Sequence, residues 1–317
     1  MTDGKPTIGL ALGSGAARGW AHIGVIQALE EAGIRPTLVA GCSFGALVGA
    51  GYAGESMDKL ETWARSIRSW DVMRLLDVRL GGGLIEGDDL MRSLAKQVEP
   101  VDIEKLRVPF AAVATDLEAG REVWLREGSL IDAVHASIAV PGLMSPVRNQ
   151  GRWLVDGGLT DPVPVSLCRA LGADVVIAVN LNSDLVGRHV RDIRGAARHD
   201  TDNESGLRKW VDGLDERLLD GRIGKWLEER DKEEPTPGML DVMAGAINIM
   251  QDRITRSRMA GDPPELMISP KLSHIGLLEF ERANETIEAG REAAERALKD
   301  SPLLPELRGE SGRSSQD

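Results

Sequence analysis

Gly41 and Gly45 flank Ser43 in a G-x-S-x-G pattern, which is typical of a serine nucleophile. The pattern lies between a predicted strand over 36–41 and a predicted small-residue helix over 44–54. A sharp strand-to-helix turn would expose the serine hydroxyl at a helix N-terminus, where the helix dipole favours developing negative charge. The alternative is a tight turn with an incidental serine, and the strand-to-helix context favours the nucleophile.

A serine nucleophile needs a base, and Asp156, followed by Gly157 and Gly158, is one candidate at the end of a predicted strand. A carboxylate with its ordinary pKa near 4 is a weak base, but desolvation raises that pKa. Taken alone, Asp-Gly-Gly is also a good turn sequence. Of the five histidines, two lie inside predicted helices and two in the charged insertion, and His274 could follow the serine in the chain order that an α/β-hydrolase triad requires. The α/β-hydrolase fold places its nucleophile after several strands, whereas Ser43 follows only the second predicted strand, so the sequence disfavours the triad.

The glycine loop over 13–19, Gly-Ser-Gly-Ala-Ala-Arg-Gly, follows the first predicted strand. Loops of this kind direct backbone N–H groups at an anion. A nucleotide phosphate fits poorly. The loop lacks the Gly-Lys-Ser/Thr ending of a P-loop, and it has Arg18 where the Rossmann dinucleotide-binding pattern needs glycine. An oxyanion requires only convergent N–H groups and small residues, so the sequence favours an oxyanion cradle.

Strand and helix patterns alternate along the first 182 residues. Predicted strands cover 7–12, 36–41, 109–117, 122–128, 152–156 and 173–181, and predicted helices cover 20–33, 44–54 and 129–139. Such alternation predicts an α/β fold with a mostly parallel sheet and helices on both faces.

The remainder of the chain begins with a charged insertion at about 183–237. We expect a helix over 239–255, a strand within 264–270, a surface helix over 280–299 and a disordered tail over 308–317. Five apolar residues of the first of these helices recur at helical spacing, a pattern that favours a core-facing stripe over a ligand site. They are Leu240, Met243, Ile247, Met250 and Ile254.

Composition narrows the functional classes. The chain has 317 residues, 42% of them hydrophobic, and a formal net charge of −12, which disfavours nucleic acid as a partner. The absence of a long apolar run argues against a membrane span, so any membrane contact would be peripheral. The two cysteines make no disulfide framework and have no metal-type spacing, which fits a reduced, cytoplasmic setting. We expect no metal or other cofactor. The oligomeric state is not readable from the sequence.

Taken together, the glycine loop, the early G-x-S-x-G and the Asp-Gly-Gly resemble the patatin-like phospholipase family, and its bacterial RssA-type branch most. Segments such as GLALGSGAARGWAHIGV, VAGCSFGALVGA, VPGLMSPV and WLVDGG carry the resemblance, which covers about 5–182 and 238–295. It implies a three-layer α/β/α patatin-like sandwich, with one acyl hydrolase domain over 5–295 that the charged insertion interrupts.

The resemblance also implies a Ser-Asp dyad that cleaves carboxylic esters, including phospholipid or lysophospholipid acyl esters. Ser43 would attack the acyl carbonyl, Asp156 would accept its proton, and water would hydrolyse the acyl-enzyme. The N–H groups of Ser14, Gly15 and Ala16 would hold the oxyanion, with Arg18 adding charge or loop support. Two alternatives remain: a thioesterase, and a non-catalytic or weakly active regulatory module on the same fold.

The loop departs from the family's usual Gly-Gly-Gly-x-Arg/Lys-Gly, because Ser14 and Ala16 replace glycines. Backbone donors survive this change, although the two side chains restrict φ. In VPGLMSPV, Leu143 and Met144 are candidate acyl-chain contacts, with a rigid structural loop as the alternative. The glycines of 80–87 indicate a flexible connection, or a flap over the site.

Overall fold

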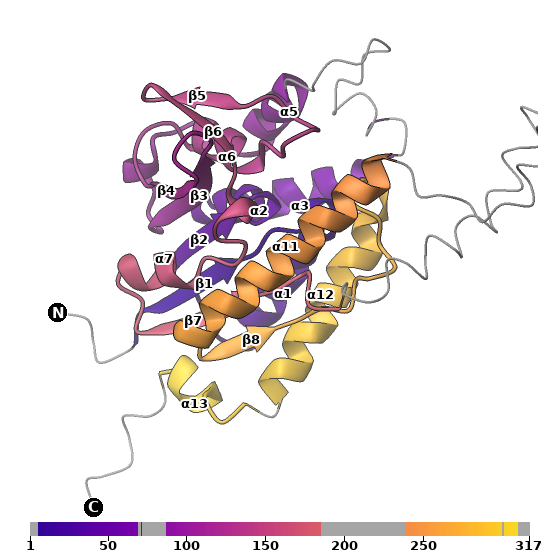
Figure 1. Cartoon of the computed structure of the whole chain (residues 1–317). Coiled ribbons are helices and arrows are strands. Elements are labelled where there is room, and N and C mark those ends of the chain that lie inside the picture. The colour runs from indigo at the N-terminus through magenta and orange to yellow at the C-terminus, as the bar shows by residue number, and fades with distance from the viewer. Residues whose placement is uncertain (1–5, 69–70, 72–86, 185–238, 300, 310–317) are drawn as a thin grey trace, which may run out of the picture.

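The computed structural model describes residues 6–68, 71, 87–184, 239–299 and 301–309 (Figure 1). These residues form an eight-stranded sheet in the order β5-β6-β3-β2-β1-β7-β8, with β4 paired to β3. The strands are β1 (Ile8–Leu12), β2 (Leu38–Cys42), β3 (Phe110–Asp116), β4 (Arg121–Leu125), β5 (Val147–Asn149), β6 (Arg152–Asp156), β7 (Val175–Val179) and β8 (Leu266–Ile268).

The centre of the sheet is parallel and one end of it is antiparallel. Strands β3, β2, β1, β7 and β8 pair in parallel. Strands β4 and β6 both pair antiparallel with β3, and β5 pairs antiparallel with β6. The predicted mostly parallel sheet is therefore confirmed.

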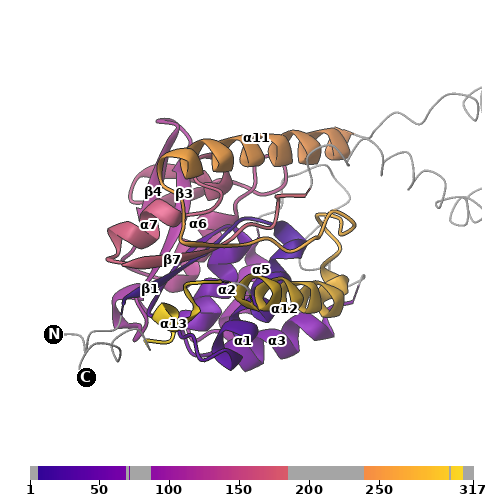
Figure 2. The ribbon, with the colours of Figure 1, turned by 90° about the horizontal axis from the view of Figure 1, so that it is seen from below.

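Helices cover both faces of the sheet. Figure 2 places α1, α2, α3 and α12 on one side and α11 on the other. The α-helices are α1 (Ala21–Glu31), α2 (Phe44–Ala53), α3 (Met57–Ser66), α5 (Asp88–Gln97), α6 (Leu130–Ile138), α7 (Val165–Ala170), α11 (Met239–Gly261), α12 (Ala283–Lys299) and α13 (Leu304–Leu307). Short 3-10 helices are η1 (Ala16–Trp20), η2 (Ile103–Lys105), η3 (Gly157–Leu159) and η5 (Phe280–Arg282). The three-layer α/β/α architecture is as predicted.

Side-chain alternation along the strands builds the two cores. In β1, Leu10 and Leu12 join the larger core with α1, α2 and α12, whereas Ala11 faces the smaller core with α7, as expected for a strand buried on both faces. Helices α1 and α12 approach closely at Gly24 and Gly290. A Cβ on either glycine would overlap the backbone of the other helix, so both positions require the smallest residue.

The predicted core-facing stripe of α11 is wrong. Met243 and Ile247 line a cavity, Met250 is exposed, and Ile254 is half-buried; the Leu240 side chain lies outside the described residues. The described side chains of α11 that are buried are polar, and they are Asn248, Gln251, Asp252 and Thr255. The described part of the helix therefore attaches to the rest of the molecule mainly through polar side chains, with Met259 packed against the smaller core.

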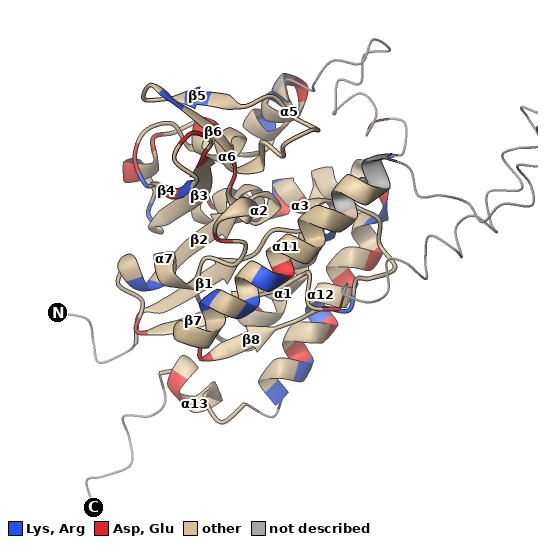
Figure 3. Ribbon diagram, in the orientation of Figure 1, with Lys and Arg blue, Asp and Glu red and all other residues tan. Residues whose placement is uncertain are grey.

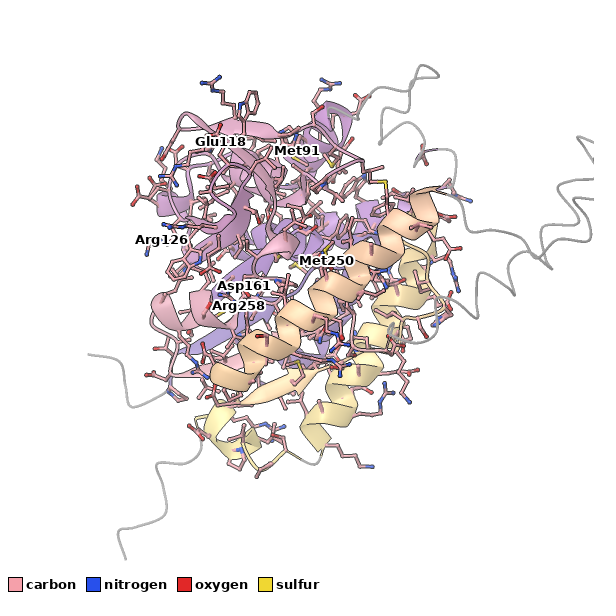
Figure 4. All side chains as sticks on the ribbon, in the orientation of Figure 1. Met91, Glu118, Arg126, Asp161, Met250 and Arg258 are labelled. Atoms are coloured by element: carbon pink, nitrogen blue, oxygen red, sulfur yellow. The ribbon has the colours of Figure 1, made fainter. Side chains whose placement is uncertain are left out.

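The C-terminal half of α11 carries charged residues of both signs, as Figure 3 shows. Arg258 in that half lies beside Asp161, as Figure 4 shows, with 3.0 Å between Nε and Oδ1, and also pairs with Glu122 of β4. These ion pairs hold the C-terminal half of α11 next to the segment that follows the Asp-Gly-Gly motif.

Several predictions fall on residues outside the described part. Almost all of the insertion at 183–237, most of the tail at 308–317 and the segment 80–86 are in this group. The limits of the acyl hydrolase domain remain a prediction.

Candidate active site

Ser43 occupies a tight turn between β2 and α2, as the G-x-S-x-G pattern predicts. Its backbone has φ 55° and ψ −125°, a left-handed value of φ that costs a non-glycine residue about 1–3 kcal/mol. A Cβ on Gly45 would overlap the carbonyl oxygen of Leu12, and a Cβ on Gly41 would overlap the backbone of Ala46. Both glycines are therefore needed for the turn that presents the Ser43 hydroxyl.

Asp156 ends β6 directly beside this turn. The Ser43 hydroxyl donates to Asp156 Oδ2 over 2.5 Å, and the Gly158 N–H donates to Oδ1 over 2.7 Å. The backbone carbonyl of Asp156 accepts from the Thr115 hydroxyl over 2.9 Å. In the Asp-Gly-Gly motif, a Cβ on Gly157 would overlap the carbonyl of Val113 on β3. The motif thus allows close packing at its first glycine and holds the carboxylate through its second.

Burial governs the protonation of this carboxylate. Asp156 is 3% exposed, and desolvation raises its pKa to about 6, while hydrogen bonds from Ser43 and Gly158 oppose that rise. At pH 7 most Asp156 side chains are therefore ionised. A carboxylate with this pKa is a stronger base than an exposed one and can accept a proton from the hydroxyl it contacts.

The glycine loop lies against the elbow, and its N–H groups differ in availability. The Ser14 N–H donates to the carbonyl of Pro162 over 2.8 Å, so it is already bonded. For the N–H groups of Gly15 and Ala16, no partner is found within the described part of the chain. Ala16 adopts φ 48°, so alanine accepts the left-handed conformation that glycine would take more easily. Of the three predicted donors, Gly15 and Ala16 are the available ones.

Arg18 and His22 brace the loop from inside the protein. Arg18 is 1% exposed; its Nε donates to the Gly15 carbonyl over 3.3 Å and one terminal nitrogen donates to Asn248 of α11 over 3.2 Å. Burial lowers the pKa of Arg18 to about 10, so it stays cationic at neutral pH. Burial also lowers the pKa of His22 to about 4. The neutral imidazole therefore donates from Nε2 to the Gly13 carbonyl, 2.8 Å away.

A cavity of about 430 Å³ opens onto Ser43 and the glycine loop. Apolar side chains make up most of its wall, and these are Val140, Pro141, Leu143, Met243, Ile247, Leu277 and Leu278. Four polar lining residues, Ser14, Arg18, Asn248 and Gln251, belong to or adjoin the glycine loop and the Asp-Gly-Gly motif, and the charged Glu279 lines the cavity beside Leu278. Of the two predicted acyl contacts, Leu143 lines this cavity. Met144 is instead buried in the larger core, so its prediction as an acyl contact is wrong.

The disfavoured triad finds no support in the position of His274. That histidine is exposed, and its Nε2 lies 2.9 Å from Glu285 of α12. Among the residues that the structure describes, no group of three or more His, Cys, Asp or Glu side chains could hold a metal ion. Likewise, none of the described helices is both long and apolar enough to cross a membrane.

Comparison with known proteins identifies the family. The sequence profile of the patatin-like phospholipases matches residues 10–169, which include the glycine loop, Ser43 and Asp156. The chain belongs to the patatin-like phospholipase family. This membership confirms the resemblance seen in the motifs and makes the protein an enzyme of the lipid acyl hydrolase class.

Relatives of this patatin-like chain extend the comparison beyond the profile. An uncharacterized NTE family protein of Mycobacterium tuberculosis is 37% identical over 93% of this chain and 92% of its own length. Human patatin-like phospholipase domain-containing protein 6 is 36% identical over 56% of this chain and 13% of its own. Lysophospholipase NTE1 of Mycosarcoma maydis is 36% identical over 56% of this chain and 10% of its own length. Against the crystal structure of VipD from Legionella pneumophila, the TM-score is 0.44 at 14% identity, over 93% of this chain and 66% of that one.

Sequence reasoning missed several polar residues around the site. Asn248 and Gln251 lie within a helix whose apolar residues suggested a core-facing stripe, and Asn182 bonds Gln251 over 2.9 Å. Ser137 of α6 gave no signal beyond its place in a predicted helix, yet its hydroxyl accepts the Ser43 N–H over 2.8 Å. Such partners arise from contacts between distant segments, which no local pattern encodes.

Proposed function

We propose that this protein is a serine hydrolase that cleaves lipid acyl esters through a dyad of Ser43 and Asp156. The observation that carries the proposal is the 2.5 Å hydrogen bond between these two side chains, at a strained elbow on the wall of an apolar cavity. A nucleophile, a base and a place for an acyl chain therefore meet at one point.

In the first half of the reaction, Ser43 Oγ attacks the acyl carbonyl carbon as its proton passes to Asp156 Oδ2. The electron pair of the C=O bond moves to oxygen, and the N–H groups of Gly15 and Ala16 hold that oxyanion, with the Arg18 cation supporting the loop. The tetrahedral intermediate then collapses, the ester C–O bond breaks, and the leaving alcohol takes the proton from Asp156.

In the second half, water attacks the acyl-enzyme while Asp156 accepts one of its protons. Collapse of the second tetrahedral intermediate returns that proton to Ser43 Oγ and releases the fatty acid. Atoms and charges balance without a cofactor.

Substrate class follows from the cavity. Its apolar wall suits an acyl chain, whereas the polar groups beside the glycine loop and the Asp-Gly-Gly motif suit the ester head. We infer that the substrates are phospholipid or lysophospholipid acyl esters. A thioester would fit the same machinery, and relative turnover of matched oxygen esters and thioesters decides between the two.

We further place the enzyme in the cytoplasm and expect peripheral contact with lipid. Cys42 and Cys168 are free, buried thiols, which is consistent with a reducing compartment. Leu278 is exposed at the mouth of the cavity, and Ile249 and Met250 are exposed on α11. Cosedimentation with zwitterionic phosphatidylcholine vesicles tests the contact; protein that stays in the supernatant would contradict it.

The decisive experiment combines turnover with covalent labelling. We expect the native protein to hydrolyse p-nitrophenyl butyrate and lysophosphatidylcholine, and to react with a fluorophosphonate at Ser43. Ser43→Ala should abolish labelling and reduce turnover by about a thousandfold or more, with unchanged circular dichroism. A native protein that neither labels nor hydrolyses any ester would instead be a non-catalytic module, and the proposal would fail.

A further inference from the structure

The backbone of Ser43 needs support from outside its own turn. Ser43 has a positive φ and stands directly before the first residue of α2, so its N–H has no partner inside that helix. The residue is buried, and an unpaired buried N–H would be unfavourable. Whatever group accepts this N–H therefore helps to decide whether the turn keeps its shape.

That group is the hydroxyl of Ser137, which is fully buried on α6. The hydroxyl has a single hydrogen, and it donates that hydrogen to the carbonyl of Val113 on β3 over 2.6 Å. Its lone pairs are then directed at the Ser43 N–H, 2.8 Å away. Ser137 thus ties the elbow to the neighbouring strand through two hydrogen bonds.

The same segment also holds the other member of the dyad. Ala139, two residues further on, accepts the Asp156 N–H at its carbonyl oxygen over 2.9 Å. The backbones of Ser43 and Asp156 are consequently both fixed by residues 137–139. The next residue, Val140, lines the cavity. One continuous segment therefore contacts both members of the dyad and the cavity.

We propose that Ser137 is a positioning residue, which keeps Ser43 Oγ within hydrogen-bond reach of Asp156 and aimed into the cavity. The proposal rests on the proposed function, because it presumes that Ser43 is the nucleophile. Ser137 does not touch substrate in this scheme. Since the Ser137 hydroxyl already accepts the Ser43 N–H, that N–H is not available as an oxyanion donor. The hydrogen bonds to the oxyanion must therefore come from the glycine loop.

The test compares Ser137→Ala and Ser137→Cys with a matched control. Thr286 of α12 is also fully buried, and its hydroxyl donates to the Arg282 carbonyl over 2.8 Å, so Thr286→Val removes a similar hydrogen bond away from the site. Measurements are kcat and KM on p-nitrophenyl butyrate, the rate of fluorophosphonate labelling, and Tm.

We expect Ser137→Ala to lower kcat and the labelling rate by about tenfold or more, with KM within about twofold of native. Ser137→Cys, which keeps a weak donor and acceptor on a larger atom, should recover part of both rates. Thr286→Val should leave both rates unchanged. If Ser137→Ala does not fold, the Cys variant alone decides, with a loss of about threefold or more expected in both rates.

Two results overturn the inference: rates within about twofold of native in the folded Ser137 variants, or an equal loss in Thr286→Val. Either result would leave the proposed function intact, because that function is judged separately by labelling of the native protein at Ser43.

Discussion

Replacing Asp156 with asparagine should abolish activity and at the same time stabilise the fold. The carboxylate is buried, and its pKa lies at about 6 rather than near 3.8 because desolvation disfavours the charged form. At pH 7 the native protein therefore holds a charge that would be better solvated in the unfolded chain. Asparagine has a similar shape but cannot ionise, so it removes this unfavourable contribution.

The size of the effect follows from linkage between protonation and folding. A rise of about two pKa units corresponds to about 3 kcal/mol at pH 7. Because the folded pKa is the higher one, stability from this group is fully present below about pH 4 and is lost as the pH rises through about 6. The amide oxygen of the introduced asparagine can still accept the Gly158 N–H, but the amide group meets Ser43 less favourably than the carboxylate does. We therefore expect a net gain of about 1–3 kcal/mol at pH 7.

Urea unfolding of native protein and Asp156→Asn, at pH 7 and at pH 4, measures this gain. The two proteins should differ at pH 7 and agree within about 1 kcal/mol at pH 4. Glu118→Gln, which neutralises an exposed carboxylate, is the control and should show no such pH-dependent gain. The reasoning about stability would be refuted if Asp156→Asn were less stable than native at pH 7, or if its gain in stability were the same at both pH values. Retained ester turnover in this variant would refute the assignment of Asp156 as the base.

Two further predictions concern the same site. First, kcat/KM should fall about tenfold per pH unit below about pH 6 and level off above it, since Asp156 must be ionised to accept a proton; a stopped-assay pH profile checks this, and a flat profile down to about pH 5 would contradict it. Second, Gly45→Ala should destabilise the fold by about 3 kcal/mol or more, because its Cβ would overlap the Leu12 carbonyl. Gly245→Ala on α11 meets no atom within 4 Å and should stabilise by about 0.5–1 kcal/mol; thermal melts of both variants provide the comparison.

The parts of the site that were predictable are those whose conformation is set locally. Ser43 could be located because a strand, two glycines and a helix start within about ten residues leave few other backbone paths. Asp156 could be located because two glycines directly after a strand both permit close packing and supply an N–H to the carboxylate. That the two side chains meet required the resemblance to a family, since they are 113 residues apart in the chain.

The parts that were not predictable depend on packing between distant segments. The glycine loop suggests the Ser14 N–H as an oxyanion donor, but the carbonyl of Pro162 takes it. The position of Met144 beside Leu143 suggests the acyl pocket, but its side chain packs into the larger core. In each case neighbouring residues of one loop have different surroundings, and hydrophobicity alone cannot distinguish a substrate wall from a core.

Helix α11 shows why this distinction matters for a protein that handles lipid. Sequence periodicity assumes that an apolar stripe is buried by the protein itself. Here Asn248 bonds Arg18 beside the glycine loop and Gln251 bonds Asn182, so polar groups attach the helix. Met243 and Ile247 are left to line the cavity. An apolar stripe that lines a cavity looks identical in sequence to one that packs into a core, and here the buried polar residues between its members are the sign that separates them.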